Sequence, residues 1–196
     1  MVAVGAREAA LAGLREEPLG NLCHDRILPS VIVGAASNPR EDTTMSVEVG
    51  QEAPDFEIRN QNGTPVRLSS FRGSKNVVLV FYPMAFTPTC TGELCAIRDE
   101  HTVFENDDTV VFGISCDSPA TLKVFAAKEG YEFDLLSDWW PHGEVSKAYG
   151  VFLEERGFPL RGTFVIDKQG VVRWSVVNSP ADTRSIADYR DALASL

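Results

Sequence analysis

The sequence around Cys90 decides the fold, and it reads Phe81-Tyr82-Pro83-Met84-Ala85-Phe86-Thr87-Pro88-Thr89-Cys90-Thr91-Gly92-Glu93-Leu94-Cys95. An almost continuous apolar run, residues 76–81, leads into this stretch, as expected of a strand that is covered on both faces. A helical pattern leads out of it, since Thr87 is a favourable N-cap residue and Pro88 a favourable first helical residue. Cys90 therefore falls in the first turn of a helix that follows a buried strand.

This position favours thiol chemistry at Cys90. In the first turn of a helix, unpaired backbone N–H groups and the positive end of the helix dipole favour the thiolate, which is the nucleophilic form. The alternative is that Cys90 simply packs, because free cysteine is among the most buried residue types. The predicted cap, the place between strand and helix, and Pro83 upstream favour function, so we interpret Cys90 as an activated nucleophile.

Strands and helices alternate along the chain from Met45 onward. The predicted elements are a hairpin over 56–59 and 64–68, buried strands over 76–81 and 110–115, helices over about 88–105, 119–129 and 144–149, a second hairpin over 162–167 and 171–176, and a closing helix over 183–196. This order predicts an α/β fold, a thioredoxin-like sandwich in which helices flank a central mixed sheet.

Residues 1–44 differ from the rest of the chain. They show no sustained strand pattern and one weak helical pattern, and residues 36–44 are typical of a linker. We expect residues 1–44 to be disordered or to be an upstream extension outside the mature domain, and residues 45–196 to form the folded domain. Cys23 lies in the first of these segments, and we assign it no role.

Composition excludes several classes of function. The net charge of -10 argues against binding to nucleic acid or to an anionic membrane surface. No apolar run approaches the roughly 18 residues that span a bilayer, and charged residues interrupt the N-terminal region where a signal peptide would be apolar, so we expect a cytoplasmic protein. Four cysteines are too few for a disulfide scaffold at this length, and the scattered histidines do not predict a zinc site.

The residues Pro83-x-x-x-Thr87-x-x-Cys90 match the P-x-x-x-[T/S]-x-x-C signature, and the chain thereby resembles the peroxiredoxins. The resemblance covers nearly all of residues 45–196 and includes residues 53–56 and 161–167. Within the family, the chain resembles the one-cysteine, alkyl hydroperoxide reductase E type. That closer match rests on two segments, Leu136-Ser137-Asp138-Trp139-Trp140-Pro141-His142-Gly143 and Ala148-Tyr149-Gly150-Val151-Phe152.

The resemblance implies a role for each matched residue. Cys90 would be the peroxidatic cysteine, which attacks a peroxide oxygen and becomes a sulfenic acid. Thr87 would hold the substrate oxygen, and Arg161 would stabilise the thiolate and the charge that develops on the leaving oxygen. Pro83 would shield the sulfur, and Glu93 would orient an arginine. Without the resemblance, a surface position after a loop would be the better interpretation of Arg161.

The resemblance also implies a function, a thiol-dependent peroxidase in antioxidant defence and redox homeostasis. Its substrates would be hydrogen peroxide, organic hydroperoxides or peroxynitrite, and no cofactor or metal is expected because the sulfur carries the redox change. A separate thiol system would reduce the oxidised cysteine, either thioredoxin, a glutaredoxin-like protein or a low-molecular-weight thiol. The family further implies a homodimer.

Cys95 departs from the one-cysteine pattern, although the bacterioferritin-comigratory type often has a cysteine at this spacing. Five helical residues correspond to about 7.5 Å of rise and roughly 140° of rotation. A disulfide needs Cα atoms within about 7 Å and converging Cβ vectors, so an intact helix forbids a Cys90–Cys95 bond. Two roles stay open for Cys95: a resolving cysteine that acts after the helix unwinds, or a packed or half-exposed helix residue.

Other residues and functions remain as alternatives. Cys116 is expected to pack at the end of a strand, with a resolving role less favoured. Trp139, Trp140 and Phe86 are candidates to line the substrate mouth or a dimer surface, although for lone aromatic residues a place in the core or at an interface is favoured. A thioredoxin-like disulfide oxidoreductase would need C-x-x-C at the helix start, where Thr87 replaces the first cysteine. A non-enzymatic redox sensor or holdase would use the same sulfenic acid to signal.

Overall fold

The computed structural model describes residues 47–196, so the expectation for residues 1–44 lies outside the described residues. The strands are β1 (Glu57–Asn60), β2 (Pro65–Arg67), β3 (Asn76–Phe81), β4 (Thr109–Ser115), β5 (Asp134–Ser137), β6 (Phe152–Leu153), β7 (Phe158–Pro159), β8 (Arg161–Ile166) and β9 (Val172–Asn178). The helices are the 3-10 helix η1 (Leu68–Phe71) and α1 (Pro88–Asp99), α2 (His101–Phe104), α3 (Pro119–Glu129), α4 (Glu144–Ala148) and α5 (Ile186–Ala194).

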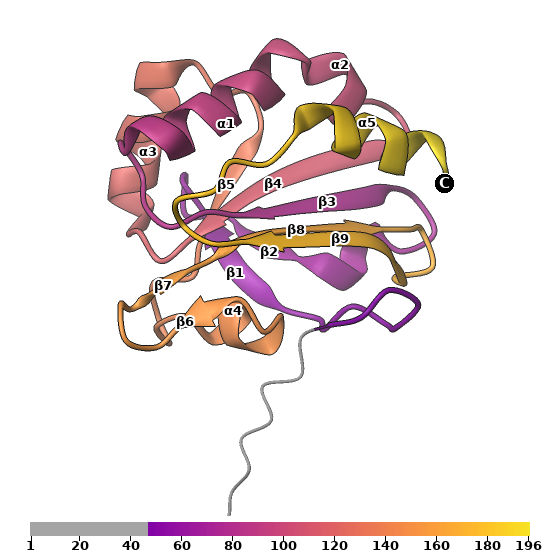
Figure 1. The fold of residues 1–196 in the computed structure, drawn as a ribbon, viewed down its shortest axis with the longest axis horizontal. Coiled ribbons are helices and arrows are strands. Elements are labelled where there is room, and N and C mark those ends of the chain that lie inside the picture. The colour runs from indigo at the N-terminus through magenta and orange to yellow at the C-terminus, as the bar shows by residue number, and fades with distance from the viewer. Residues whose placement is uncertain (1–46) are drawn as a thin grey trace, which may run out of the picture. The chain divides into compact units, whose positions relative to one another are not determined.

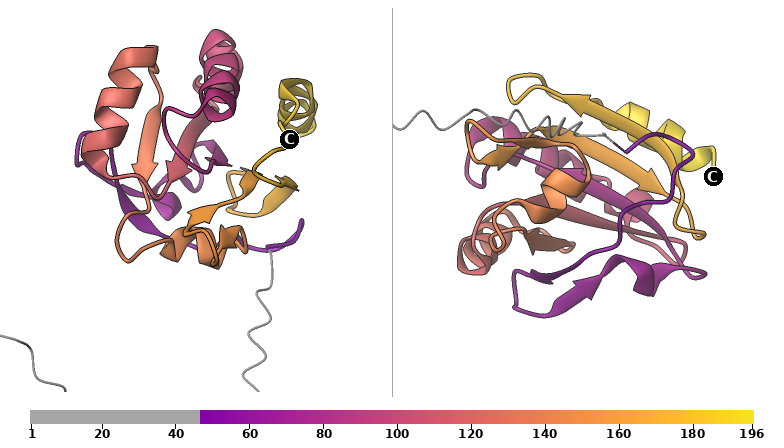
Figure 2. Two further views of the ribbon diagram at one scale, coloured as in Figure 1. Left: turned by 60° about the vertical axis from the view of Figure 1, so that its left-hand side comes forward. Right: turned by 90° about the horizontal axis from the view of Figure 1, so that it is seen from below.

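A seven-stranded mixed sheet forms the centre of the fold, in the order β2-β1-β5-β4-β3-β8-β9. Strand β4 runs parallel to β3 and β5, and the other neighbours are antiparallel. Helices α1, α3 and α5 cover one face of this sheet, and α4 lies on the other (Figures 1 and 2). The arrangement confirms the predicted thioredoxin-like sandwich with its central mixed sheet.

Strand β3 has the alternation of a strand buried on both faces. Val78 and Val80 pack into the apolar cluster beneath α1 and α3, whereas Val77, Leu79 and Phe81 pack into the cluster on the α4 side. The side chains of these five residues are almost fully buried. This central strand therefore gives α1 a rigid point of departure.

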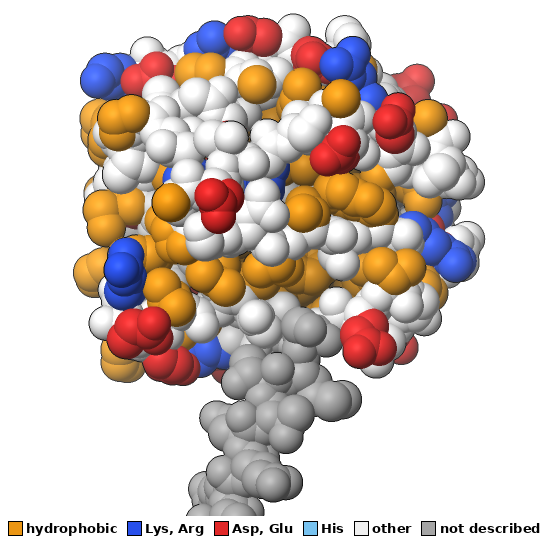
Figure 3. Space-filling view, viewed as in Figure 1, with side chains coloured by type: hydrophobic (Ala, Val, Ile, Leu, Met, Phe, Trp, Pro, Cys, Tyr) orange, Lys and Arg blue, Asp and Glu red, His pale blue; other side chains and the backbone are white. Residues whose placement is uncertain are grey.

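Helix α5 closes the sandwich over the antiparallel edge of the sheet. Its Tyr189 contacts Trp174 of β9, with 5.7 Å between the ring centroids. Half-buried Val176, Ile186 and Leu193 pack against the same core, and apolar side chains gather along the seam between α5 and β9 (Figure 3). The closing helix is shorter than the predicted 183–196. Ser185 has extended backbone angles, so the helix begins at Ile186, and it ends at Ala194.

The helix expected over 88–105 is divided in two. Glu100 has backbone angles of φ −107° and ψ 31°, which end α1 before α2 begins. The change of direction lets Phe104 reach the core, where its ring lies 6.1 Å from that of Tyr189. The sequence did not predict β5, which pairs with β4 across four residues and with β1 across two, because so short a segment has no distinct periodicity.

Within residues 47–196, no helix has the length and apolar character needed to cross a bilayer. In the same part of the chain, no three His, Cys, Asp or Glu side chains are grouped so that they could bind a metal ion.

Candidate active site

Cys90 lies at the third position of α1, as the sequence predicts. Thr87 is the N-cap residue with extended backbone angles, and Pro88 is the first helical residue. The Thr87 hydroxyl donates to the carbonyl of Met84 at 3.1 Å and makes no bond to the helix. The first intrahelical bond runs from the Thr91 amide to the Thr87 carbonyl at 2.9 Å. The amide of Cys90 precedes that bond and belongs to the unpaired donors of the helix N-terminus.

The Cys90 side chain is fully buried and packs in the apolar cluster that includes Tyr82 and Leu94. Pro83 is also buried, whereas Met84 beside it is exposed. Cys90 and Pro83 are thus both buried, while the loop between β3 and α1 presents Met84 to the surface.

Two contacts fix the loop that precedes α1. The amide of Ala85 donates to Oδ2 of Asp117 at 2.8 Å, which ties the loop to the end of β4. Phe86 has a φ of 63°, a left-handed conformation that is unfavourable for a bulky side chain. Its ring packs against Phe125 of α3, with 4.8 Å between the centroids. Packing therefore offsets the backbone strain at the entrance to α1.

Glu93 and Arg161 meet on the Cys90 side of α1. Glu93 lies three residues after Cys90, so the two side chains project from the same face of the helix. Arg161 begins β8, and its Nη1 donates to Oε2 of Glu93 at 2.6 Å while its Nε donates to the carbonyl of Pro180 at 2.9 Å. Glu93, which the resemblance implied would orient an arginine, thus contacts Arg161 in the structure.

Arg184 is a residue of this cluster that the sequence did not reveal. It bonds Glu93 three times, from Nη2 at 2.8 Å, from Nε at 3.2 Å and from its backbone amide at 2.7 Å. Its Nη1 donates to the carbonyls of Phe81 and Gly162 and to the Thr163 hydroxyl. Arg184 therefore joins the ends of β3 and β8 to α1. Arg184 falls within the helix predicted over 183–196, but in the structure it precedes α5, and no signal in the sequence marked it as a site residue.

The Glu93–Arg161–Arg184 cluster carries a surplus positive charge. Both guanidinium groups are almost fully buried, and an arginine keeps its charge at any physiological pH. Burial alone would raise the pKa of Glu93, but the hydrogen bonds and charge of Arg184, and then the charge of Arg161, outweigh it and hold the pKa below its ordinary value. Two cations thus face one carboxylate, and one positive charge is left over in the cluster around Glu93, one helical turn after Cys90.

The structure does not bring the other cysteines to Cys90. Helix α1 is wound through both Cys90 and Cys95, and all the cysteines within the described part of the chain are free. Cys95 is half-buried, and its sulfur lies 3.8 Å from the hydroxyl of Tyr131. Cys116 follows β4 and is buried, and burial together with the charges of Asp138 and Asp117 raises its pKa to about 12.

Four large apolar side chains near the loop are exposed. The exposed fraction is 46% for Met84, 43% for Phe86, 54% for Trp139 and 80% for Trp140. Met84 and Trp139 line one hollow of about 340 Å³, which also borders Pro83. Phe86, Trp139 and Trp140, the candidates for a substrate mouth or a dimer surface, therefore lie on the surface of the protein.

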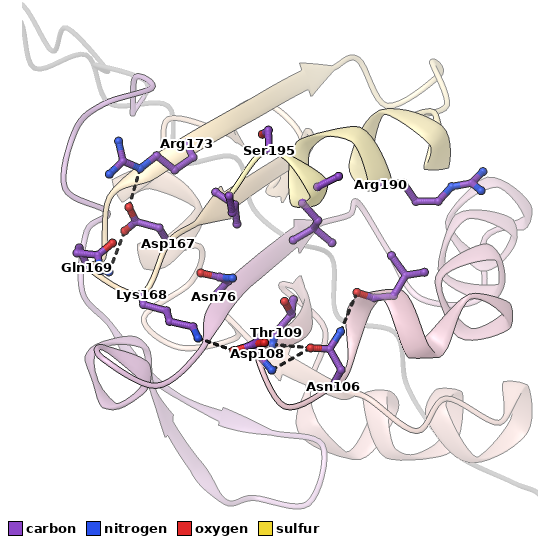
Figure 4. Close-up of a pocket in the computed structure, with 14 residues that line it drawn as sticks. Asn76, Asn106, Asp108, Thr109, Asp167, Lys168, Gln169, Arg173, Arg190 and Ser195 are labelled. Atoms are coloured by element: carbon purple, nitrogen blue, oxygen red, sulfur yellow. Dashed lines mark hydrogen bonds and ion pairs between the residues drawn. The ribbon is translucent and has the colours of Figure 1, made fainter.

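A larger hollow of about 940 Å³ lies at the opposite end of β3 (Figure 4). Asn76, the first residue of β3, lines it together with the end of α5 and the turn between β8 and β9. Two of its cationic side chains are paired with acids, Lys168 with Asp108 and Arg173 with Asp167. Its lining contains no cysteine, so thiol chemistry belongs to the carboxyl end of β3.

Comparisons with known proteins agree with this geometry. The model of the AhpC/TSA family matches residues 49–175. Alkyl hydroperoxide reductase E of Mycobacterium tuberculosis is 49% identical over 150 residues, which are 76% of this chain and 98% of the relative. Peroxiredoxin Bcp of Bacillus subtilis is 39% identical over 132 residues, covering 64% of this chain and 82% of the relative.

A solved structure supports the same assignment. The crystal structure of peroxidoxin BcpB from Mycobacterium tuberculosis superposes with a TM-score of 0.64 and 36% identity, covering 76% of this chain and 95% of that one. The region matched by the family model, residues 49–175, contains strands β1 to β8, the loop before Cys90, and both Glu93 and Arg161. The chain therefore belongs to the AhpC/TSA family of peroxiredoxins, which are thiol-dependent peroxidases.

Proposed function

We propose that Cys90 is the peroxidatic cysteine of this peroxidase. Its thiolate sulfur attacks one oxygen of the peroxide, the O–O bond breaks, and the other oxygen takes up a proton and leaves as water or an alcohol. Cys90 is then a sulfenic acid. The observation that carries the proposal is the place of Cys90 in the first turn of α1, one turn from a buried cluster with a surplus positive charge.

The charge of this cluster fits the reaction. A buried anion needs a partner, and the surplus positive charge of the Glu93–Arg161–Arg184 cluster supplies one for the Cys90 thiolate. As the O–O bond breaks, negative charge moves to the leaving oxygen. Fixed donors that are aimed at such a charge lower a reaction barrier, because they need no reorganisation. We assign this role to Arg161, which Glu93 and Arg184 hold in place.

Thr87 and Pro83 are proposed to shape the substrate site. The Thr87 hydroxyl uses its proton on the Met84 carbonyl, so its lone pairs remain to accept the O–H of a hydroperoxide. Pro83 has no N–H group that would have to be paired, and its buried ring keeps water from the sulfur. Displacement of the exposed Met84 side of the loop would admit the peroxide.

We propose hydrogen peroxide, organic hydroperoxides or peroxynitrite as substrates. The relative named alkyl hydroperoxide reductase E supports organic hydroperoxides in particular. Reduction of the sulfenic acid is assigned to an external thiol system, either thioredoxin, a glutaredoxin-like protein or a low-molecular-weight thiol. Cys95 is either a resolving cysteine, which forms a disulfide with Cys90 after α1 unwinds, or a packed residue of the helix. The free cysteines of residues 47–196 support a cytoplasmic location, where thiols stay reduced.

We also propose a homodimer that uses the exposed surface of Met84, Phe86, Trp139 and Trp140. All four side chains are exposed, Met84 and Trp139 line one hollow, and large exposed apolar groups are typical of association surfaces. Light scattering after size-exclusion chromatography should give twice the chain mass for the parent, and Trp140→Glu should shift it towards the monomer. A monomeric parent would contradict the proposal.

Peroxide consumption in the presence of a reducing thiol tests the role of Cys90. Cys90→Ser should abolish consumption, because the serine hydroxyl is neither ionised nor oxidisable to an equivalent of the sulfenic acid. Cys116→Ser, which replaces another buried cysteine, is the matched control and should retain the parental rate. A Cys90→Ser variant that consumes peroxide as fast as the parent would rule out the assignment.

A further inference from the structure

The hydroxyl of Tyr131 lies between two groups of α1. It donates to the carbonyl of Thr91 at 3.5 Å and lies 3.8 Å from the sulfur of Cys95. Either the phenol or the thiol can be the donor in the second contact, because each carries one proton. The carbonyl of Thr91 also accepts the amide of Cys95 in a regular α-helix. Tyr131 therefore supports the turn of α1 that separates Cys90 from Cys95.

The ring of Tyr131 is fixed by aromatic neighbours. It stacks on Phe133, with 5.2 Å between the centroids and an interplanar angle of 25°, and it meets Phe125 edge-on at 5.2 Å. Phe125 in turn packs against Phe86, the residue with the left-handed backbone just before α1. One aromatic group thus holds both the entrance of α1 and its second turn, so these two segments are restrained together.

A Cys90–Cys95 disulfide requires this turn to open. Five helical residues place the two Cα atoms about 7.5 Å apart along the axis, beyond the reach of a disulfide. Unwinding breaks the bond between the Cys95 amide and the Thr91 carbonyl. It also separates the Tyr131 hydroxyl from the Thr91 carbonyl and frees the Cys95 thiol from Tyr131. Tyr131 consequently opposes the movement that would bring the two sulfurs together.

We propose that Tyr131 is a positioning residue that keeps α1 wound and slows the condensation of oxidised Cys90 with Cys95. The inference rests on the proposed roles of these two cysteines. In the condensation, the Cys95 sulfur attacks the sulfur of the Cys90 sulfenic acid, the S–S bond forms, and the sulfenic oxygen leaves as water with the thiol proton. By delaying this step, Tyr131 prolongs the life of the sulfenic acid and gives an external thiol time to reduce it directly.

The variant Tyr131→Phe tests this role, because it removes the hydroxyl and keeps the stacked ring. Both hydroxyl contacts are long and therefore weak, so we expect the Cys90–Cys95 disulfide to form about fivefold faster after one equivalent of peroxide. The oxidation of Cys90 itself should keep the parental rate. Disulfide and trapped sulfenic acid are counted by mass spectrometry on samples quenched over time, and exchange of the Cys95 amide hydrogen should be faster in the variant.

Tyr149→Phe is the matched control. It also removes a buried hydroxyl bonded to a carbonyl, that of Pro54 at 2.9 Å, but it lies in the apolar cluster on the other face of the sheet. Its disulfide rate and Cys95 amide exchange should equal those of the parent. The proposal is overturned if Tyr131→Phe closes the disulfide at the parental rate or more slowly, or if neither parent nor variant forms that disulfide. Persistent peroxidase activity in Cys90→Ser would instead refute the proposed function.

Discussion

Cys90 and Cys116 occupy related places and have different surroundings. The strands that precede them, β3 and β4, are parallel neighbours, so both cysteines lie beyond the same edge of the sheet. Both are buried. Cys90, however, lies in the first turn of a helix that carries Glu93 and its two arginines one turn later, whereas Cys116 faces the carboxylates of Asp117 and Asp138.

The carboxylates around Cys116 have structural partners of their own. Asp138 accepts the amides of Val145 and Ser146 and the hydroxyl of Ser146, and these bonds hold the start of α4. Asp117 accepts the amide of Ala85. These acids are fixed by the fold, and their negative charge opposes a thiolate at Cys116. The strand end thus supplies burial at both cysteines, and at Cys116 the neighbouring negative charges oppose ionisation of the thiol.

The largest expected effect is slow alkylation of Cys116. A pKa of about 12 leaves Cys116 with about a thousandfold less thiolate near neutral pH than an ordinary cysteine. Iodoacetamide should therefore label Cys95, which is half-buried, long before Cys116. Peptide mass spectrometry over a time course measures both, and the chain unfolded in urea, in which all cysteines should react, is the control. Equal labelling of Cys95 and Cys116 in the folded protein would contradict the raised pKa of Cys116.

Loss of the Arg161 charge should bring Cys90 closer to the behaviour of Cys116. Arg161→Met removes the donor assigned to the leaving oxygen, and we expect the rate of Cys90 oxidation to fall by about a hundredfold to a thousandfold. Stopped-flow fluorescence with excess peroxide measures this rate. Arg173→Met removes a half-exposed arginine paired with Asp167, far along the sheet, and should stay within about twofold of the parent. Equal losses in the two variants would mean that the effect is not local.

Glu93→Gln tests the buried cluster through stability. The variant keeps the shape of the side chain but leaves two buried guanidinium groups without a counter-charge, so the free energy of unfolding should fall by about 3 kcal/mol. Urea unfolding near neutral pH measures the change. An exposed acid such as Glu57, which pairs with Arg67 on the surface, provides the control, and Glu57→Gln should cost less than about 1 kcal/mol.

The difference in the free energy of unfolding between the parent and Glu93→Gln should depend on pH. The pKa of Glu93 is depressed in the folded protein from an ordinary value of 4.5, so folding is stabilised by its ionised form. The stability advantage of the parent over Glu93→Gln should be fully present above that ordinary value and should disappear as the pH falls through the depressed pKa. A difference that does not change with pH in this acidic range would contradict the ionised state of Glu93.

Asp117→Asn is expected to have the smallest effect. It removes the charge that receives the Ala85 amide and the Ser115 hydroxyl, so the loop before α1 loses about 1 kcal/mol of support. We expect the Cys90 oxidation rate to change by less than about fivefold and the Cys116 pKa to fall. Alkylation of Cys116 as a function of pH measures the second effect, and an unchanged or higher pKa would contradict the electrostatic difference between the two cysteines.

The start of α1 could be predicted from the sequence because its signals are local. A cap at Thr87 and a proline at the next position place Cys90 in the first turn, and the alternation of β3 follows from an apolar run. The P-x-x-x-[T/S]-x-x-C signature and the later Arg161-Gly162-Thr163 segment then indicated Pro83, Thr87 and Arg161 as candidate site residues.

The rest depends on contacts between distant segments. Arg184 joins β3, β8 and Glu93, and Tyr131 meets α1 through its hydroxyl, but neither lies in a segment whose own pattern predicts such a contact. The break at Glu100 and the strand β5 likewise follow from packing and pairing across the sheet. These features depend on which side chains the fold brings together, and a single sequence records that only indirectly.

The most direct test of the account is to locate the first oxidised sulfur. The protein is treated with one equivalent of peroxide, the sulfenic acid is trapped with a dimedone reagent, free thiols are blocked, and peptides are analysed by mass spectrometry. We expect the trapped label, or a disulfide derived from it, on Cys90 and none on Cys116. A label that first appears on Cys116, or that persists at the same yield in Cys90→Ser, would contradict the assignment of Cys90 as the reacting residue.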